Sequence, residues 1–400
     1  MKTFDTLYKA LLLLLSISII LPLSGCWSSV ELNERAFVKM IIIDKTKDGI
    51  ELSFAFPLPN RTIPGTAGGS GTSSGAPYTF ITQQEKNIGK AYRKIQSDLS
   101  REITFGQTRV VVIGKEMAES GVGPLLDFLG REPKFHINAT LFVTSGKANV
   151  ITTIPSVFER FPSDILVAYG QHNVIFNTTI KDFLVENHSG GDIIAPMLAF
   201  SQKNLISEKN KEQTWLGTEG AAIFSKGKMV GKLDTKEMRG GLWISGKLID
   251  AEISIPSPTD GKNISFMIHH KRTRIRPQVH DEQIKLQINS EANVDVLNST
   301  SNIDLNNLDQ LNNLEQALGK EISRRMITSI DRTRKVKSDA FHFGNFIDWH
   351  YPKKWKEIRS NWRDLYVNHV DFDIKLKITI NRLGTIQETE KVNNYKEIRE

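Results

Sequence analysis

The chain has 400 residues, of which 39% are hydrophobic and 24% charged, and it carries a net charge of +7 and one cysteine. This composition is that of a packed globular protein of two or three domains, which excludes a disordered chain. One cysteine excludes an intrachain disulfide and a cysteine-rich metal site, and the modest, dispersed positive charge suits a body beside anionic lipid better than a nucleic-acid binder.

The N-terminus has the pattern of a secretory leader. Lys2 and Lys9 lie before a mostly aliphatic run at residues 11–21. A membrane-spanning helix needs about 20 apolar residues to cross about 30 Å of hydrocarbon, so this run is too short for a stable anchor but has the length of a signal-peptide core. No later segment of the sequence has the pattern of a transmembrane span. We therefore expect the body to be exported from the cytoplasm.

The residues that follow the apolar run, Leu23-Ser24-Gly25-Cys26, resemble the bacterial lipobox. The resemblance implies that the Cys26 thiol takes diacylglycerol, that a lipoprotein signal peptidase removes residues 1–25, and that the new amino group is acylated. Two or three acyl chains on one residue would hold the chain firmly on a membrane, because a single chain binds only reversibly. Ordinary secretion, with Cys26 as an unmodified thiol, is the alternative.

The first half of the chain predicts a mixed sheet flanked by helices. Strands are expected at 37–43, 50–58, 78–82, 108–114, 139–144 and 193–202, and helices at 87–101, 124–130, 148–158 and 178–187. The near-continuous Val/Ile run at 108–114 is typical of a strand buried on both faces. Alternating strands and helices favour an α+β class, with mixed β-sheets flanked by helices.

Two glycine-rich stretches match functional motifs in part, without the structural context that those motifs need. The flexible Gly/Ser/Thr stretch at 61–77 contains Gly71-Thr72-Ser73-Ser74-Gly75, but no buried strand and helix flank it, as a nucleophile elbow requires. Residues 241–248 fall one residue short of a phosphate-binding loop, because Leu248 replaces the hydroxyl residue that binds magnesium. Since no two histidines are spaced for a metal on one helix face, we expect no catalytic, cofactor or metal site.

The wholly polar stretch 207–213 predicts a linker between an N-terminal domain, residues 26–206, and a C-terminal domain, residues 214–400. The N-terminal domain can be one unit or two subdomains, so two main domains or three are compatible with the sequence. The second half begins with a predicted hairpin turn at 226–228. It continues with half-exposed strands near 253–255, 264–275 and 284–296, a long amphipathic helix at 308–330 and a final strand at 370–380.

Four basic residues, His270, Arg272, Arg274 and Arg276, fall on a common face of one predicted strand, and we name them the basic row. Such a row can contact lipid phosphate, an acidic partner or nucleic acid, or it can simply be the solvated face of a sheet. The absence of interleaved aromatic residues argues against single-stranded nucleic acid.

Motifs spread over the chain match one known family. They are Gly25-Cys26-Trp27 with Glu31-Leu32-Asn33, Ile43-Asp44-Lys45, the segment 109–118, Arg131-Glu132-Pro133, and Asp339-Ala340-Phe341-His342-Phe343-Gly344. Together they resemble the Ger(x)C family, the lipoprotein C subunits of spore germinant receptors. Ser28 departs from the acidic residue that family members usually carry after the tryptophan. The resemblance covers nearly the whole chain after the leader.

The resemblance implies a lipoprotein on the outer face of the spore inner membrane, assembled with an A-type and a B-type integral membrane subunit. It implies a non-enzymatic role in stabilising or coupling the complex, with nutrient contact left to the membrane subunits and no nucleic-acid partner. A lipid-anchored solute-binding protein feeding a transporter is the alternative, and it would need a ligand cleft. A lipid-anchored enzyme has no supporting motif.

Overall fold

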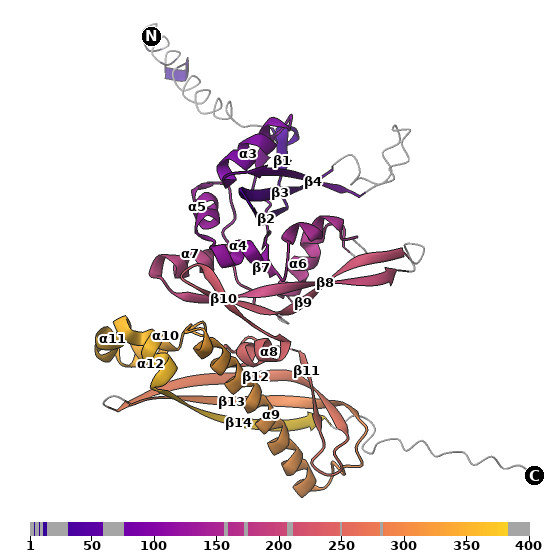
Figure 1. Cartoon of the computed structure of the whole chain (residues 1–400), viewed down its shortest axis with the longest axis vertical. Helices are drawn as coiled ribbons and strands as arrows, with labels where there is room; N and C mark the ends of the chain where they lie inside the picture. Colours follow the sequence, from indigo (N-terminus) through magenta and orange to yellow (C-terminus); the bar gives the residue numbers. More distant parts are fainter. Residues whose placement is uncertain are drawn as a thin grey trace, which may run out of the picture.

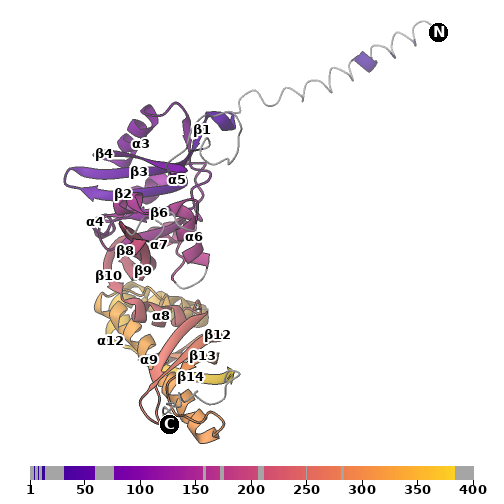
Figure 2. The same ribbon diagram turned by 90° about the vertical axis from the view of Figure 1, so that its right-hand side faces the viewer.

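The computed structural model describes residues 4, 8, 11–13, 31–58, 76–155, 159–171, 175–205, 211–248, 250–280 and 283–382. Two bodies lie one above the other along the long axis, an N-terminal body around an eight-stranded sheet and a C-terminal body around a four-stranded sheet (Figure 1). Figure 2 shows the same stacking from the side. The predicted α+β class, with mixed sheets flanked by helices, is confirmed.

The N-terminal sheet is mixed, with parallel strands at its centre. Its strands are, in order across the sheet, β10 (Lys228–Leu233), β9 (Lys211–Ser225), β8 (Asp192–Leu205), β7 (Thr140–Thr144), β6 (Val110–Ile113), β2 (Met40–Thr46), β3 (Gly49–Pro57) and β4 (Tyr78–Glu85). β6 lies parallel to both β2 and β7, and all four of its residues are buried. The prediction of a strand buried on both faces at this position is therefore confirmed, because helices cover both sides of it.

Different helices cover the two faces of this sheet. One face packs against α3 (Ile88–Ser97), α4 (Lys115–Ser120), α5 (Gly123–Arg131) and α7 (Ile180–Ser189). The other face packs against the 3₁₀ helix η3 (Ala148–Thr153) and α6 (Pro162–Gln171), and its apolar core continues without a break into the C-terminal body. The two bodies therefore share one hydrophobic core.

The C-terminal sheet has the order β11 (Ala251–Pro256), β12 (Asn263–His280), β13 (Gln283–Ser299) and β14 (Val370–Arg382). The helix α9 (Leu308–Lys335) crosses one face of it (Figure 1). Leu314, Leu318, Ile322, Met326 and Ile330 of the apolar stripe that the 3- and 4-residue spacing predicts are buried, Leu311 is half-buried, and Leu308 at its start is 74% exposed. Three short helices follow α9: α10 (Phe343–His350), α11 (Pro352–Ile358) and α12 (Trp362–Asn368).

The helix α8 (Thr235–Ile244) lies between the two sheets and allows them to share a core. A Cβ atom on Gly240 would stand 2.4 Å from the carbonyl oxygen of Arg325 in α9, so only glycine permits this approach. Trp243, about one turn later in the helix, is buried, and its Nε1 donates to Ser290 Oγ of β13 at 2.8 Å. The partial match to a phosphate-binding loop at 241–248 thus begins inside a helix.

The structure differs from the prediction of a linker at 207–213. β8 and β9 pair antiparallel on either side of residues 206–210, which lie outside the described residues, and β9 begins at Lys211. β9 and β10 complete the N-terminal sheet, so the chain passes between the bodies near Asp234 instead. Residues 201–204 of β8, which lead toward this stretch, are exposed, and its polar sequence agrees with that exposure. Of the flexible stretch predicted at 61–77, only Ala76 and Pro77 are described.

A buried polar network joins the two bodies. The Asp192 carboxylate at the start of β8 accepts two hydrogen bonds from the Arg363 guanidinium of α12, at 2.7 and 2.9 Å. It also accepts from the backbone N–H of Asp339 at 2.8 Å. The Asp339 carboxylate in turn accepts from Phe343 N, Gly344 N and Trp362 Nε1, at 2.8, 2.8 and 2.7 Å. These hydrogen bonds fix α10 and α12 against the N-terminal sheet.

We predict that Arg363→Ala destabilises the chain by about 3 kcal/mol, because it leaves the Asp192 carboxylate buried without its charged partner. Chemical denaturation of the full-length chain measures this change. The matched control is Arg131→Ala, because the ion pair of Arg131 with Asp127 is fully exposed and its loss should change stability little. Equal effects of the two substitutions would contradict the prediction.

The second prediction from this network concerns pH. Burial is the main cause that raises the pKa of Asp339 from its ordinary value of 3.8 to about 6, against the opposing effect of its hydrogen bonds. The folded chain therefore binds more protons than the unfolded chain between these values. The stability that Asp339 contributes is fully present below pH 4 and is lost as the pH rises through 6, by about 3 kcal/mol at most.

The comparison with Asp339→Asn isolates this contribution, because the variant cannot titrate at position 339. We expect the difference in unfolding free energy, wild type minus variant, to fall between pH 4 and pH 7. Denaturant unfolding of both proteins at several pH values measures that difference. A difference that is constant across this range would show that the pKa of Asp339 is not raised.

Candidate functional site

The predicted lipidation site, Leu23, Ser24, Gly25 and Cys26, lies outside the described residues, so lipidation stays a prediction. The described chain resumes at Glu31 with the 3₁₀ helix η2 (Leu32–Glu34). The strand β1 (Arg35–Phe37) follows and pairs in parallel with β5 (Glu102–Thr104) at one end of the N-terminal body. The lipobox is therefore only a few residues away from the folded body.

The basic row lies on β12. Arg272, Arg274 and Arg276 are all exposed, while Thr273 and Ile275 between them are half-buried. His270 belongs to the same strand and follows a register shift after Ile268. The Cα partners of the three arginines on β13 are, in the same order, Glu291, Asn289 and Gln287. Only the first arginine thus stands opposite a carboxylate.

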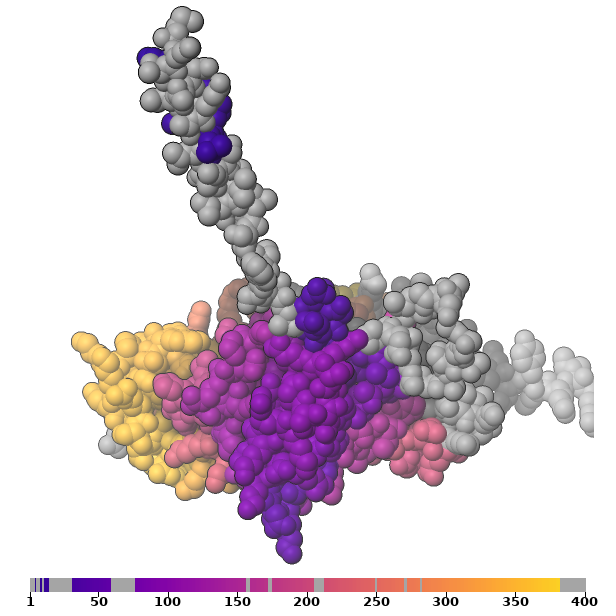
Figure 3. Space-filling view, turned by 90° about the horizontal axis from the view of Figure 1, so that it is seen from above, coloured from indigo at the N-terminus to yellow at the C-terminus, as the bar shows by residue number. Residues whose placement is uncertain are grey.

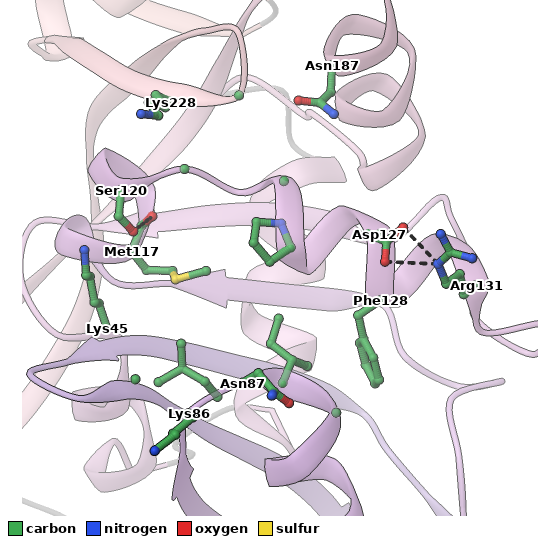
Figure 4. A pocket seen from close by; sticks show the side chains of 18 of the residues that line it. Lys45, Lys86, Asn87, Met117, Ser120, Asp127, Phe128, Arg131, Asn187 and Lys228 are labelled. Atoms are coloured by element: carbon green, nitrogen blue, oxygen red, sulfur yellow. Dashed lines mark hydrogen bonds and ion pairs between the residues drawn. The ribbon is translucent and has the colours of Figure 1, made fainter.

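The sequence did not predict a cleft of about 790 Å³ in the N-terminal body, which Figure 4 shows from close by. The β2–β3 turn contributes Lys45 and the beginning of α3 contributes Asn87, whose side chain caps the helix by accepting from Lys90 N. The opposite wall comes from α4 and α5, with Met117 and Phe128 as apolar lining. Five separate segments form this cleft, so no local motif marks it.

The cleft carries more positive than negative side chains. Its basic residues are Lys45, Lys86, Arg131, Lys226 and Lys228, and its acidic residues are Asp127 and Glu132. Arg131 Nε donates to both oxygens of Asp127 at 2.9 and 3.0 Å, and this hydrogen bonding lowers the pKa of the Asp127 carboxyl. The remaining lysines favour an anionic group, although salt screens charges at this exposed position.

The described residues form neither a metal-binding cluster nor a membrane-spanning helix. No group of three or more His, Cys, Asp or Glu side chains in the described ranges is placed to hold a metal ion. Among the same residues, no helix combines the length and the apolar character needed to cross a membrane.

Comparison with known proteins gives the family. Residues 28–200 match the family described as spore germination protein N-terminal domain, and residues 219–384 match the family described as spore germination B3/GerAC like, C-terminal. Spore germination protein KC of Bacillus subtilis (strain 168) is 26% identical over 94% of this chain and 96% of its own length. Spore germination protein B3 of the same strain is 22% identical over 92% of this chain and 96% of its own length.

A solved structure has the same fold. The crystal structure of the GerBC protein superposes with a TM-score of 0.54 at 18% identity, and the match covers 84% of this chain and 96% of that chain. The two family matches together cover both bodies and most of the chain. The resemblance inferred from the motifs is confirmed: the chain belongs to the Ger(x)C family of spore germination proteins.

Proposed function

We propose that the chain is the membrane-anchored lipoprotein subunit of a spore nutrient germinant receptor, acting with integral membrane A-type and B-type subunits to trigger germination. The observation that carries the proposal is the family match over both bodies, since the relatives are named as spore germination proteins. The role is one of assembly and coupling, without catalysis and without direct nutrient contact. Its place is the outer face of the spore inner membrane.

The position of Cys26 sets how the body would be held. Nine peptide steps separate Cys26 from Arg35, the first residue of β1. An extended chain spans at most about 3.3–3.6 Å per residue, so a lipid on Cys26 would keep β1 within about 30 Å of the membrane. The end of the N-terminal body that carries β1 and α3 would then face the bilayer, and the C-terminal body would lie farther away (Figure 2).

The receptor role predicts a nutrient-specific defect. Spores that lack this chain should lose dipicolinic acid release in response to a subset of amino acids, sugars or salts, while other germinants act normally. Affinity capture of a tagged copy from spore membranes should retain the A-type and B-type subunits. Normal release with every nutrient, together with capture of neither subunit, would contradict the proposal.

The anchor predicts that Cys26→Ala moves the protein from the membrane fraction to the soluble fraction without loss of stability. Because position 26 precedes the first described strand, we expect the substitution to leave the packing of the folded body unchanged. Fractionation and a thermal melt of wild type and variant measure the two effects. A variant that stays with the membrane in the absence of the partner subunits would show that Cys26 does not supply the anchor.

The cleft of Figure 4 favours one second candidate, a lipid-anchored solute-binding protein that feeds a transporter. A volume of about 790 Å³ is in the range of small-molecule sites. Calorimetric titration of the purified chain with amino acids and sugars separates the candidates. Saturable binding of one solute would favour the solute-binding protein, and no heat of binding would favour the assembly role.

A further inference from the structure

The strand β12 has a free edge. β11 pairs with β12 only from Asn263 to Ile268, whereas β12 continues to His280 with β13 as its other partner. Among the described residues, none forms a backbone ladder with the β11 side of β12 after Ile268. Pro277 agrees with this position, because proline within a sheet is confined to edges and bulges. A free edge presents unpaired N–H and C=O groups that another extended chain can use.

A groove of about 540 Å³ lies along this edge. Residues 273–276 of β12 form one side of it, the end of α8 and the turn at 245–247 form another, and α10 forms the third. Thr273 Oγ1 donates to the carbonyl oxygen of Trp243 at 3.0 Å, which fixes the end of α8 beside the strand. The helices after α9 protrude to one side of the molecule, where they are visible from above beyond the N-terminal body (Figures 1 and 3).

The groove also offers exposed aromatic surface. Phe346 and Trp349 on α10 line it, and their ring centroids are 5.2 Å apart in an edge-to-face arrangement. The side chain of Trp349 is 68% exposed, although tryptophan is usually well buried. An apolar side chain from a bound strand would find contact area here, in addition to any backbone hydrogen bonds.

The charges around the groove are positive and unpaired. Lys247, Arg274 and Arg276 line it and are exposed, and no carboxylate among the described residues forms an ion pair with them. The neighbours of the two arginines on β13, Asn289 and Gln287, are neutral. Arg272 is on the same face but stands opposite Glu291 and is not part of the groove lining.

We propose that an extended, acidic segment of a partner protein binds in this groove by adding a strand to the free edge of β12 at residues 273–276. Backbone pairing would supply affinity, the aromatic pair would take one apolar side chain, and Lys247, Arg274 and Arg276 would select acidic side chains. This inference rests on the proposed function only where it identifies the partner as a receptor subunit. The groove and the binding test concern this chain alone.

A second copy of the chain fits the groove less well. Pairing of two β12 edges would place two rows of arginines side by side, and like charges on neighbouring strands are destabilising. Edge arginines and a proline can also serve only to prevent strand pairing between molecules. If these residues only protect the edge, the chain should bind no peptide, whereas the proposal predicts saturable binding.

The test uses the full-length chain in detergent and a fluorescent seven-residue peptide of alternating glutamate and valine. Anisotropy should show saturable binding, and a peptide with lysine in place of glutamate should not bind. The double variant Arg274→Gln/Arg276→Gln should weaken binding about ten-fold or more, because it removes two charge-assisted contacts. The matched control Arg272→Gln, on the same strand face, should weaken it about two-fold or less.

Backbone pairing is tested separately. A peptide N-methylated at alternate residues keeps its charges but cannot complete the ladder, so its binding should be lost. Hydrogen exchange should show new protection at residues 273–276 when the unmethylated peptide binds. The proposal would be overturned if the chain bound no peptide at millimolar concentration, or if the lysine or N-methylated peptide bound equally well. It would also be overturned if phosphatidylglycerol vesicles retained the chain more strongly than the peptide does, with the same dependence on Arg274 and Arg276. Unchanged thermal melts of the variants exclude unfolding as a cause.

Discussion

The packing of α8 between two sheets is the constraint on which the architecture depends. The helix must approach α9 so closely that position 240 accepts no Cβ, and Gly241 leaves similar room for the Phe341 ring, which a Cβ would meet at 2.8 Å. Because this contact is made, the apolar face of the eight-stranded sheet and the inner face of the four-stranded sheet lie in one core. The polar network of Asp192, Asp339 and Arg363 then connects the two bodies by hydrogen bonds on the side of α12.

The same junction explains part of the C-terminal family motif in physical terms. Asp339 supplies the carboxylate that receives the first N–H groups of α10, and Asp192 anchors the backbone at the same residue. A Cβ on Gly344 would lie 2.5 Å from the Trp355 ring, so glycine is needed where the two tryptophans pack. The Trp355 and Trp362 rings meet edge to face at 5.4 Å, and Trp362 is buried. The motif thus specifies residues that hold the N-terminal and C-terminal bodies together.

Local patterns predicted those elements whose burial follows a simple period. The run at 108–114 became the buried strand β6, and the leucine stripe at 308–330 became α9. They failed where long-range contacts decide the structure. α8 was missed because two adjacent glycines disfavour a helix in isolation, and here they serve a close helix contact. Of the helix expected at 148–158, the described residues 148–155 contain only the short η3, where Asp44 from a distant strand accepts from Ala148 N and Asn149 N at 2.8 Å each.

The candidate sites also divide into those that a local sequence pattern indicates and those that only the fold brings together. The lipobox and the basic row are contiguous or strand-periodic patterns, so the sequence could indicate them. The cleft of Figure 4 draws on five segments, and the groove exists because β11 is shorter than β12 and α10 returns to its edge. Neither condition can be seen in a single stretch of residues.

The parallel pairing of β13 with β14 has a consequence for the order of folding. β14 is the last described strand, and it reaches its place only after the chain has passed along α9 and the three short helices. During synthesis, the side of β13 that β14 will occupy therefore has no partner strand until the residues from Val370 onward have been made. The C-terminal body cannot close while the ribosome still holds its final residues, although the central strands of the N-terminal body are complete long before.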